Sequence, residues 1–246
     1  MVLSRSSTFA SGQGLDVHIR TTRVHSPHMD YSYISGAALK IGEHIFEVSE
    51  DGTLIVNGET VALADDGSPS SVAFAGHTVT KSFIGSKRRI IAYDLDLGDE
   101  KSIQIRSNSK TGMLFVDVNG AFTDSEGLLG AAPEADKPLL ARDGVTDLTG
   151  HWNTYGEEWQ VNDVDPKLFQ DTTRHPQYPS GCEYDATKMK NHVRRRLADT
   201  VSGVTLEVAT DACAHLLSQT KKEFCVNDIM ATGDPDLVED PFYAAN

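Results

Sequence analysis

The sequence predicts a mainly β protein, an antiparallel β-sandwich or meander followed by a small C-terminal α-helical subdomain. Short runs of β-branched and aromatic residues recur about every 8–12 positions between residues 15 and 118, separated by turn-forming residues. After residue 171 the apolar residues recur at helical spacing instead. A chain of 246 residues is long enough to bury a sizeable core in one large domain or two small ones.

The first strands show the alternation of half-buried strands. Leu15, Val17 and Ile19 alternate with polar neighbours, which places His18 on the polar side of its strand. An aromatic and aliphatic run follows at residues 31–41. Later strands are expected at residues 45–48, 54–56, 61–63, 72–74, 78–84, 89–96, 102–106 and 113–118.

Two turn signals separate consecutive strands. The pairs Asp51-Gly52 and Asn57-Gly58 favour tight hairpins, because both central residues of such turns take positive φ. We therefore expect a meander. The sequence contains neither GxGxxG nor GxxxxGK[ST], and no helical period interrupts the strands, so a doubly wound nucleotide-binding fold is not expected.

The C-terminal third has the periodicity of helices. A Pro- and Gly-containing stretch at residues 175–181 resembles a linker, and Gly233 stands where a helix C-cap is expected. Three helices are expected from the apolar stripes Met189, Val193 and Leu197; Ala209, Ala212, Cys213 and Leu216; and Phe224, Cys225 and Ile229. The chain thus divides into a Ser-rich segment (residues 1–13), a β domain (14–170), a linker (171–185) and a cysteine-bearing helical subdomain (186–246).

Composition narrows the classes of function. The formal net charge is −14, whereas phosphate binding needs clustered Lys and Arg, so we expect no nucleic-acid partner. No apolar run reaches the roughly 20 residues that span a bilayer, so no membrane span is expected. The first residues lack the basic and long apolar parts of a signal peptide. That leaves three interpretations: a cytosolic protein, a processed product, or a fragment whose start is missing.

A series of short motifs follows the last expected strand. A Gly-Leu-Leu-Gly run comes first, then an Asp-Gly pair, then a Gly-x-x-Trp ending. The order and spacing of these motifs resemble the second half of a von Willebrand factor type D domain, which has a G-L-C-G segment, a D-G pair and a G-x-x-W ending. The residues that carry the resemblance are Gly127, Leu128, Gly130, Gly144, Gly156 and Trp159.

The chain also departs from that family. The opening stretch of the family domain is absent, so residues 1–13 resemble the remnant of an early strand. Such a truncation leaves an open strand edge, which we expect residues 2–7 or a partner chain to cover. Leu129 replaces the cysteine of the G-L-C-G segment, so the disulfide that the family anchors there cannot form.

The resemblance implies a candidate calcium site. In family members the loop after the G-L-C-G segment holds calcium through oxygen ligands; here that loop offers Glu134, Asp136 and Asp143. A solvated acidic loop is the alternative, and we favour it because the family's upstream Asp and its Asn are missing. No other cofactor is expected. A second acidic stretch, Asp94, Asp96 and Asp99, places its first two carboxylates on one strand face and fits an outward-facing strand better than a metal site.

Three cysteines, Cys182, Cys213 and Cys225, lie in the last third of the sequence. Cys213 and Cys225 fall on the apolar sides of neighbouring expected helices joined by a short polar connection, which brings them face to face. We favour this disulfide, which also fits a reduced form of the eight-cysteine module that follows type D domains. A Cys182–Cys225 pairing and three reduced thiols remain as alternatives.

The resemblance implies a non-enzymatic interaction or assembly module, serving adhesion, a matrix or the scaffolding of a complex. Its partner would be a protein, and its location extracellular or in the secretory pathway, with an organelle lumen as a further possibility. One alternative is an accessory subunit docked in a larger complex. Another is a hydrolase or lipid-handling enzyme on a β scaffold. The sequence has neither G-x-S-x-G nor H-E-x-x-H, and we assign no catalytic residue.

Overall fold

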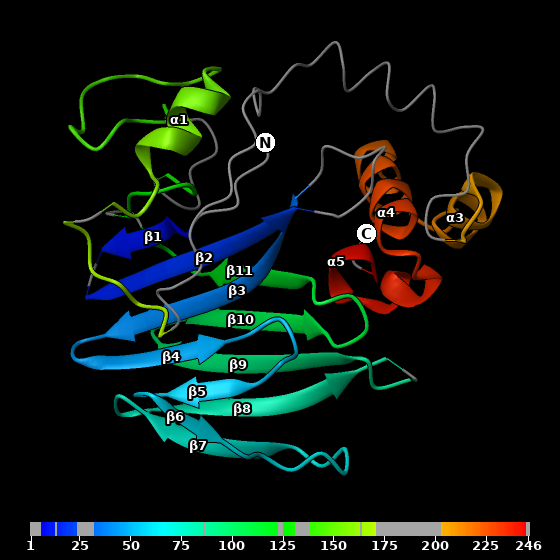
Figure 1. Ribbon diagram of the computed structural model, residues 1–246, viewed down its shortest axis with the longest axis horizontal. Helices are drawn as coiled ribbons and strands as arrows, with labels where there is room; N and C mark the ends of the chain where they lie inside the picture. Colours follow the sequence, from blue (N-terminus) through cyan, green and yellow to red (C-terminus); the bar gives the residue numbers. More distant parts are fainter. Residues whose placement is uncertain are drawn as a thin grey trace.

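The computed structural model contains an antiparallel sheet that curls into two layers (Figure 1). It describes residues 6–12, 14–23, 32–85, 87–122, 125–130, 138–162, 164–170 and 203–244. The strands are β1 (Ser6–Gly12), β2 (Leu15–Arg23), β3 (Ser32–Ile41), β4 (His44–Val48), β5 (Leu54–Val56), β6 (Glu59–Val61), β7 (Ser70–Phe74), β8 (His77–Ile84), β9 (Ile90–Gly98), β10 (Lys101–Asn108) and β11 (Leu114–Asn119). The predicted fold class, a mainly β antiparallel protein with a small C-terminal helical region, is confirmed.

Strand β3 is where the two layers separate. One edge of β3 pairs with β2, which pairs in turn with β1. The other edge pairs with β4 at one end and with β11 at the other, where Leu114 lies opposite Ile34. From β3 one layer continues through β4 and β5 to β6, and the other through β11, β10, β9 and β8 to β7. In Figure 1 the blue and cyan strands of the first layer lie in front of the green strands of the second.

Apolar side chains from the inner faces of both layers form the main core. The ring of Phe46 on β4 lies 5.6 Å from that of Phe74 on β7 and 6.1 Å from that of Tyr93 on β9. The apolar residues of the predicted alternation in β2, Leu15, Val17 and Ile19, are all buried. The outer faces of the layers can therefore contact the segments of the chain that follow β11.

The two turn signals have different outcomes. Asn57 and Gly58 form a two-residue hairpin loop between β5 and β6, with φ of 48° and 92°. Between β4 and β5 only Gly52 takes a positive φ, of 78°, because the loop is longer: Ser49 N–H donates to Thr53 O at 3.1 Å. The hairpin predicted at Asp51-Gly52 therefore forms, but without the positive φ expected at Asp51.

The helices are α1 (Trp152–Glu158), α3 (Leu206–Ala212), α4 (Gln219–Thr232), the 3-10 helix η1 (Pro235–Glu239) and α5 (Pro241–Ala244). Side-chain oxygens of Thr205 and Ser218 cap the starts of α3 and α4, and Gly233 ends α4 with φ of 69°, as expected. The helix expected from Met189, Val193 and Leu197 lies outside the described residues. Among the helices that the structure describes, none has the length and hydropathy needed to cross a bilayer.

Strand β1 lies within the Ser-rich segment, residues 1–13. It pairs with β2 along the edge that the sequence argument left open, with an irregularity between Thr8 and Ala10. The edge of β2 is thus covered by the start of the chain itself.

Candidate functional site

The residues that resemble the type D motifs gather in one segment, which we call the motif cap (residues 125–130, 138–162 and 164–170). The cap covers the outer face of β2, β3 and β4. Leu168 and Phe169 pack against Ala38 on β3, and the guanidinium of Arg20 lies 4.3 Å from the centre of the Phe169 ring. A side chain at Gly36 would come within 3.2 Å of Phe169, so the absence of one permits this close approach.

The motif residues contact one another inside the cap. The hydroxyl of Tyr155 in α1 donates to the carbonyl of Gly127, and burial raises the pKa of Tyr155 to about 12. Trp159 is buried, and its indole N–H donates to Leu140 O at 3.2 Å. Gly156 is buried within α1, whereas Leu129 is 36% exposed. The cap is therefore a packed unit and not an open loop.

Arg142 joins its own loop to residues 158–165 of the cap. Its Nη1 and Nη2 donate to the two carboxylate oxygens of Asp165 at 2.8 and 3.0 Å. Its Nε donates to Glu158 O and its Nη2 to Gln160 O, while the guanidinium lies 5.3 Å from the centre of the Trp159 ring. Burial acts to raise the pKa of Asp165, but the hydrogen bonds from Arg142 and the Asn162 N–H, together with the charge of Arg142, outweigh it and the net pKa is lowered.

The candidate calcium ligands are only partly described. Glu134 and Asp136 lie outside the described residues. The carboxylate of Asp143 accepts hydrogen bonds from Thr146 Oγ1 and from the backbone N–H groups of Val145 and Thr146, which lower its pKa. Within the described part of the chain, no three His, Cys, Asp or Glu side chains are grouped as metal ligands.

His18 is buried beneath the cap. The sequence places it on the polar side of β2, where a solvent-facing side chain is expected, but it is only 3% exposed because the cap covers that face. Burial lowers its pKa to about 4, against the opposing effects of Asp16 and Asp165. Its Nδ1 has no hydrogen-bond partner within the described residues. Polar residues at such a position are expected either at the surface or in a hydrogen bond; for His18 the surface position is wrong.

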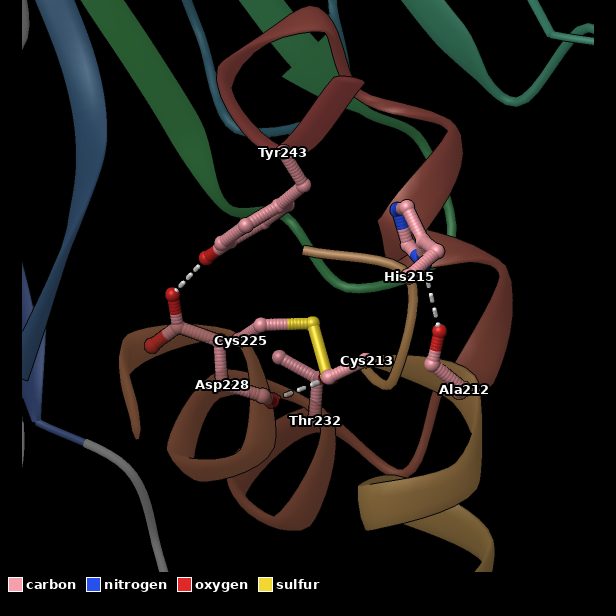
Figure 2. Close-up of a disulfide and its surroundings, with 7 residues drawn as sticks. All are labelled: Ala212, Cys213, His215, Cys225, Asp228, Thr232 and Tyr243. Carbon is pink, nitrogen blue, oxygen red and sulfur yellow. Dashed lines mark hydrogen bonds between the residues drawn. A yellow bond between two sulfur atoms is a disulfide. The ribbon is translucent and has the colours of Figure 1, made fainter. Parts of the chain in front are cut away.

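A disulfide joins Cys213 and Cys225 in the helical tail, the described residues 203–244 (Figure 2). Their Cα atoms are 6.0 Å apart, and both side chains are buried. This is the pairing that the sequence argument favours. Nearby, the hydroxyl of Tyr243 donates to the carboxylate of Asp228, which links α5 to α4. Cys182 lies outside the described residues.

Buried ion pairs fasten the tail to the second layer. Asp234 is fully buried and accepts from Arg89 at 3.1 Å and from Lys110 at 2.9 Å. Asp240 is also fully buried and accepts from Nε of Arg106 on β10 at 3.0 Å. Burial raises the pKa of Asp240, although Arg106 acts in the opposite direction. The tail helices consequently gather beside one end of the strands (Figure 1).

Beyond the tail, the outer face of the second layer carries two cross-strand rows of small polar and acidic side chains, which we call the polar face. Direct register aligns Ser71, Thr80, Asp94, Gln104 and Asp117 in the first row, and Ala73, Thr78, Asp96, Ser102 and Asn119 in the second. All of these side chains are exposed or half-buried, and neither row contains Lys or Arg. Gln104 Nε2 donates to Asp94 Oδ1 at 2.5 Å, which fixes the centre of the first row.

No protein-family model matches this chain. A search of curated proteins finds no match either.

Sequence reasoning missed the residues that fasten the outer segments to the sheet. Arg142, Arg106 and Asp240 pair across 23 to 134 positions of the sequence, and no local period indicates such contacts. Arg106 follows Gln104 on the polar phase of β10, so strand alternation predicts a solvent-facing side chain and gives no sign of its burial.

Proposed function

We propose that this chain is a non-enzymatic interaction or assembly module of the von Willebrand type D kind, acting extracellularly or in the secretory pathway. The observation that carries the proposal is the polar face. Its rows are fixed by strand register and backed by a hydrophobic core, so the surface needs little ordering on binding. The Cys213–Cys225 disulfide supports an oxidising compartment, where such bonds persist.

The polar face favours a protein partner whose contacting surface is basic. Asp94 and Asp96 supply carboxylates, and neither row contains a Lys or Arg that would neutralise them, whereas the Asp117 carboxylate pairs with Arg106. Complementary charge of this kind raises association rates and selects between partners. An accessory subunit docked in a larger complex would use the same surface.

Hydrogen exchange on the complex isolated from its native source tests the proposal. We expect the amides of β8, β9 and β10 to exchange more slowly in the complex than in the free chain, and Asp94→Asn with Asp96→Asn to weaken the complex. Glu207→Gln with Asp211→Asn, in the tail, makes the same change in net charge and serves as the control. Protection confined to another surface would contradict the proposal.

The hydrolase or lipid-handling alternative has one supporting observation. His18 is buried, with Asp16 and Asp165 in its electrostatic surroundings. A catalytic histidine, however, is held in one tautomer by a carboxylate on its second ring nitrogen, and Nδ1 of His18 has no partner within the described residues. We therefore place binding ahead of catalysis.

A further inference from the structure

The outermost strand of the second layer is an unprotected edge. Strand β7 pairs with β8 over its five residues, and in the described part of the chain no strand lies along its other side. A free edge presents unpaired N–H and C=O groups that another strand can pair with.

The three edges of the sheet are protected to different degrees. Strand β1 carries an irregularity between Thr8 and Ala10, and β6 has three residues including the charged Glu59. Bulges, charges and short length are the usual means of preventing edge pairing. Strand β7, Ser-Ser-Val-Ala-Phe, has no charge and keeps an uninterrupted register with β8. It is therefore the edge best suited to accept another strand.

We propose that β7 is a self-association edge, on which the β7 strand of a second copy of this chain pairs in antiparallel fashion about a two-fold axis through Val72. This goes beyond the proposed function, because it concerns a different surface and a different partner.

The sequence of β7 is self-complementary in that arrangement. With Val72 opposite itself, Ser71 lies opposite Ala73 of the second copy and Ser70 opposite its Phe74. Residues with inward-facing side chains (Ser70, Val72 and Phe74) then meet one another, so the cores of both copies lie on the same side of the joined sheet. A two-fold axis permits one patch to serve both partners.

The net charge of the chain favours self-association at β7 over self-association at its other surfaces. Each chain carries a formal net charge of −14, so two copies repel over most of their surfaces. An uncharged strand is a place where two such chains can meet without setting carboxylates opposite one another. The exposed side chains Ser71 and Ala73 are small and leave the strand accessible.

Sedimentation velocity of the full chain, over a range of concentrations, tests this inference. We expect the parent to show a concentration-dependent doubling of mass, and Ser71→Lys with Ala73→Lys to remain a monomer, since the two lysines face each other across the axis. Ser102→Lys with Asn119→Lys adds the same charge to the same face, on β10 and β11 away from the edge, and should still dimerise. A parent that stays monomeric at the highest concentration overturns the proposal, as does an edge variant that still dimerises.

Hydrogen exchange of the parent keeps the test independent of how the variants fold. Amides of β7 should become more protected as the concentration rises, whereas those of β6 should not change. Unchanged protection in β7 contradicts the proposal, and this outcome leaves the polar face as a binding surface unaffected.

Discussion

At the scale of single residues, His18 and Arg142 relate the motif cap to the sheet beneath it. His18 comes from the sheet and is buried by the cap, while Arg142 comes from the cap and ties its two halves together. The alternation of apolar and polar residues gave the side of β2 on which His18 lies. It could not give its burial, because that depends on a segment more than a hundred positions later.

The free energy of unfolding should fall as the pH decreases from about 6.5 to about 4. The pKa of His18 is lowered from 6.5 to about 4 in the folded protein, so over this range the unfolded chain binds a proton that the folded chain does not. His18→Gln removes this titration and should flatten the pH profile. Chemical denaturation of both proteins across the range measures the difference, and identical profiles would show that His18 is not the cause.

Arg142→Ala should lower the free energy of unfolding by about 2–3 kcal/mol, because it removes the cation paired with Asp165 and the side-chain donor to two backbone carbonyls. The fluorescence of Trp159, which lies beside the guanidinium, reports on the cap in the same experiment. Arg88→Ala removes an exposed arginine that donates to Asp66 O and should cost well under about 1 kcal/mol. Equal losses for the two variants would argue against a special role for Arg142.

At the scale of elements, local sequence patterns predicted most strands and the end of α4, since strand alternation, turn pairs and a C-cap glycine are properties of neighbouring residues. Helix α1 was not expected, because it is short and depends on the packing of Tyr155 within the cap. The helix expected to reach Leu216 ends at Ala212; Cys213 and Leu216 follow it in a turn yet remain buried. Tertiary packing, and not helical periodicity alone, therefore determines where these helices form and end.

The disulfide should stabilise the α3–α4 pair by about 2–3 kcal/mol in the chain-entropy model, since it closes a loop with a sequence separation of 12. Thermal melts of the parent and of Cys213→Ser with Cys225→Ser measure the loss, and Cys182→Ser is the matched control. Peptide mapping after blocking thiols at lysis should find the label on Cys182 alone. Label on all three cysteines would remove both the disulfide and the main support for an oxidising compartment.

Calcium binding stays a prediction of the loop that contains Glu134 and Asp136. A cation bound to the folded state alone raises the melting temperature as its concentration rises. If the site exists, the melt should shift upward in millimolar calcium relative to chelator, and Glu134→Gln with Asp136→Asn should abolish the shift. The carboxylate of Asp143 already accepts three hydrogen bonds within its own turn, so Asp143→Asn should lower stability with or without calcium. An unchanged melting temperature would favour the alternative interpretation, a solvated acidic loop without calcium.

At the scale of the whole molecule, the two-layer sheet is a platform onto which later segments of the chain are fastened. The motif cap lies over the first layer through Phe169 and its neighbours, and the tail lies against the second through Asp234 and Asp240. Neither the motif cap nor the tail covers the polar face, whose side chains are exposed or half-buried. The molecule therefore has two groups of carboxylates: the buried Asp234 and Asp240, which hold the tail, and the exposed or half-buried ones of the polar face.

This attachment predicts that the tail stays bound after the chain is cut. The sequence of residues 171–180 resembles a linker, so limited proteolysis there should divide the chain into a β-rich piece and a piece that contains the disulfide. The two pieces should co-elute, because the Arg106–Asp240 pair is buried together with aromatic contacts between Phe115 and Tyr243. Asp240→Asn leaves the Arg106 charge without its buried partner, at a cost of about 3 kcal/mol, and should let the pieces separate. Glu207→Gln, in the exposed first turn of α3, should not; separation of the parent pieces would mean that the tail is held mainly by its chain connection.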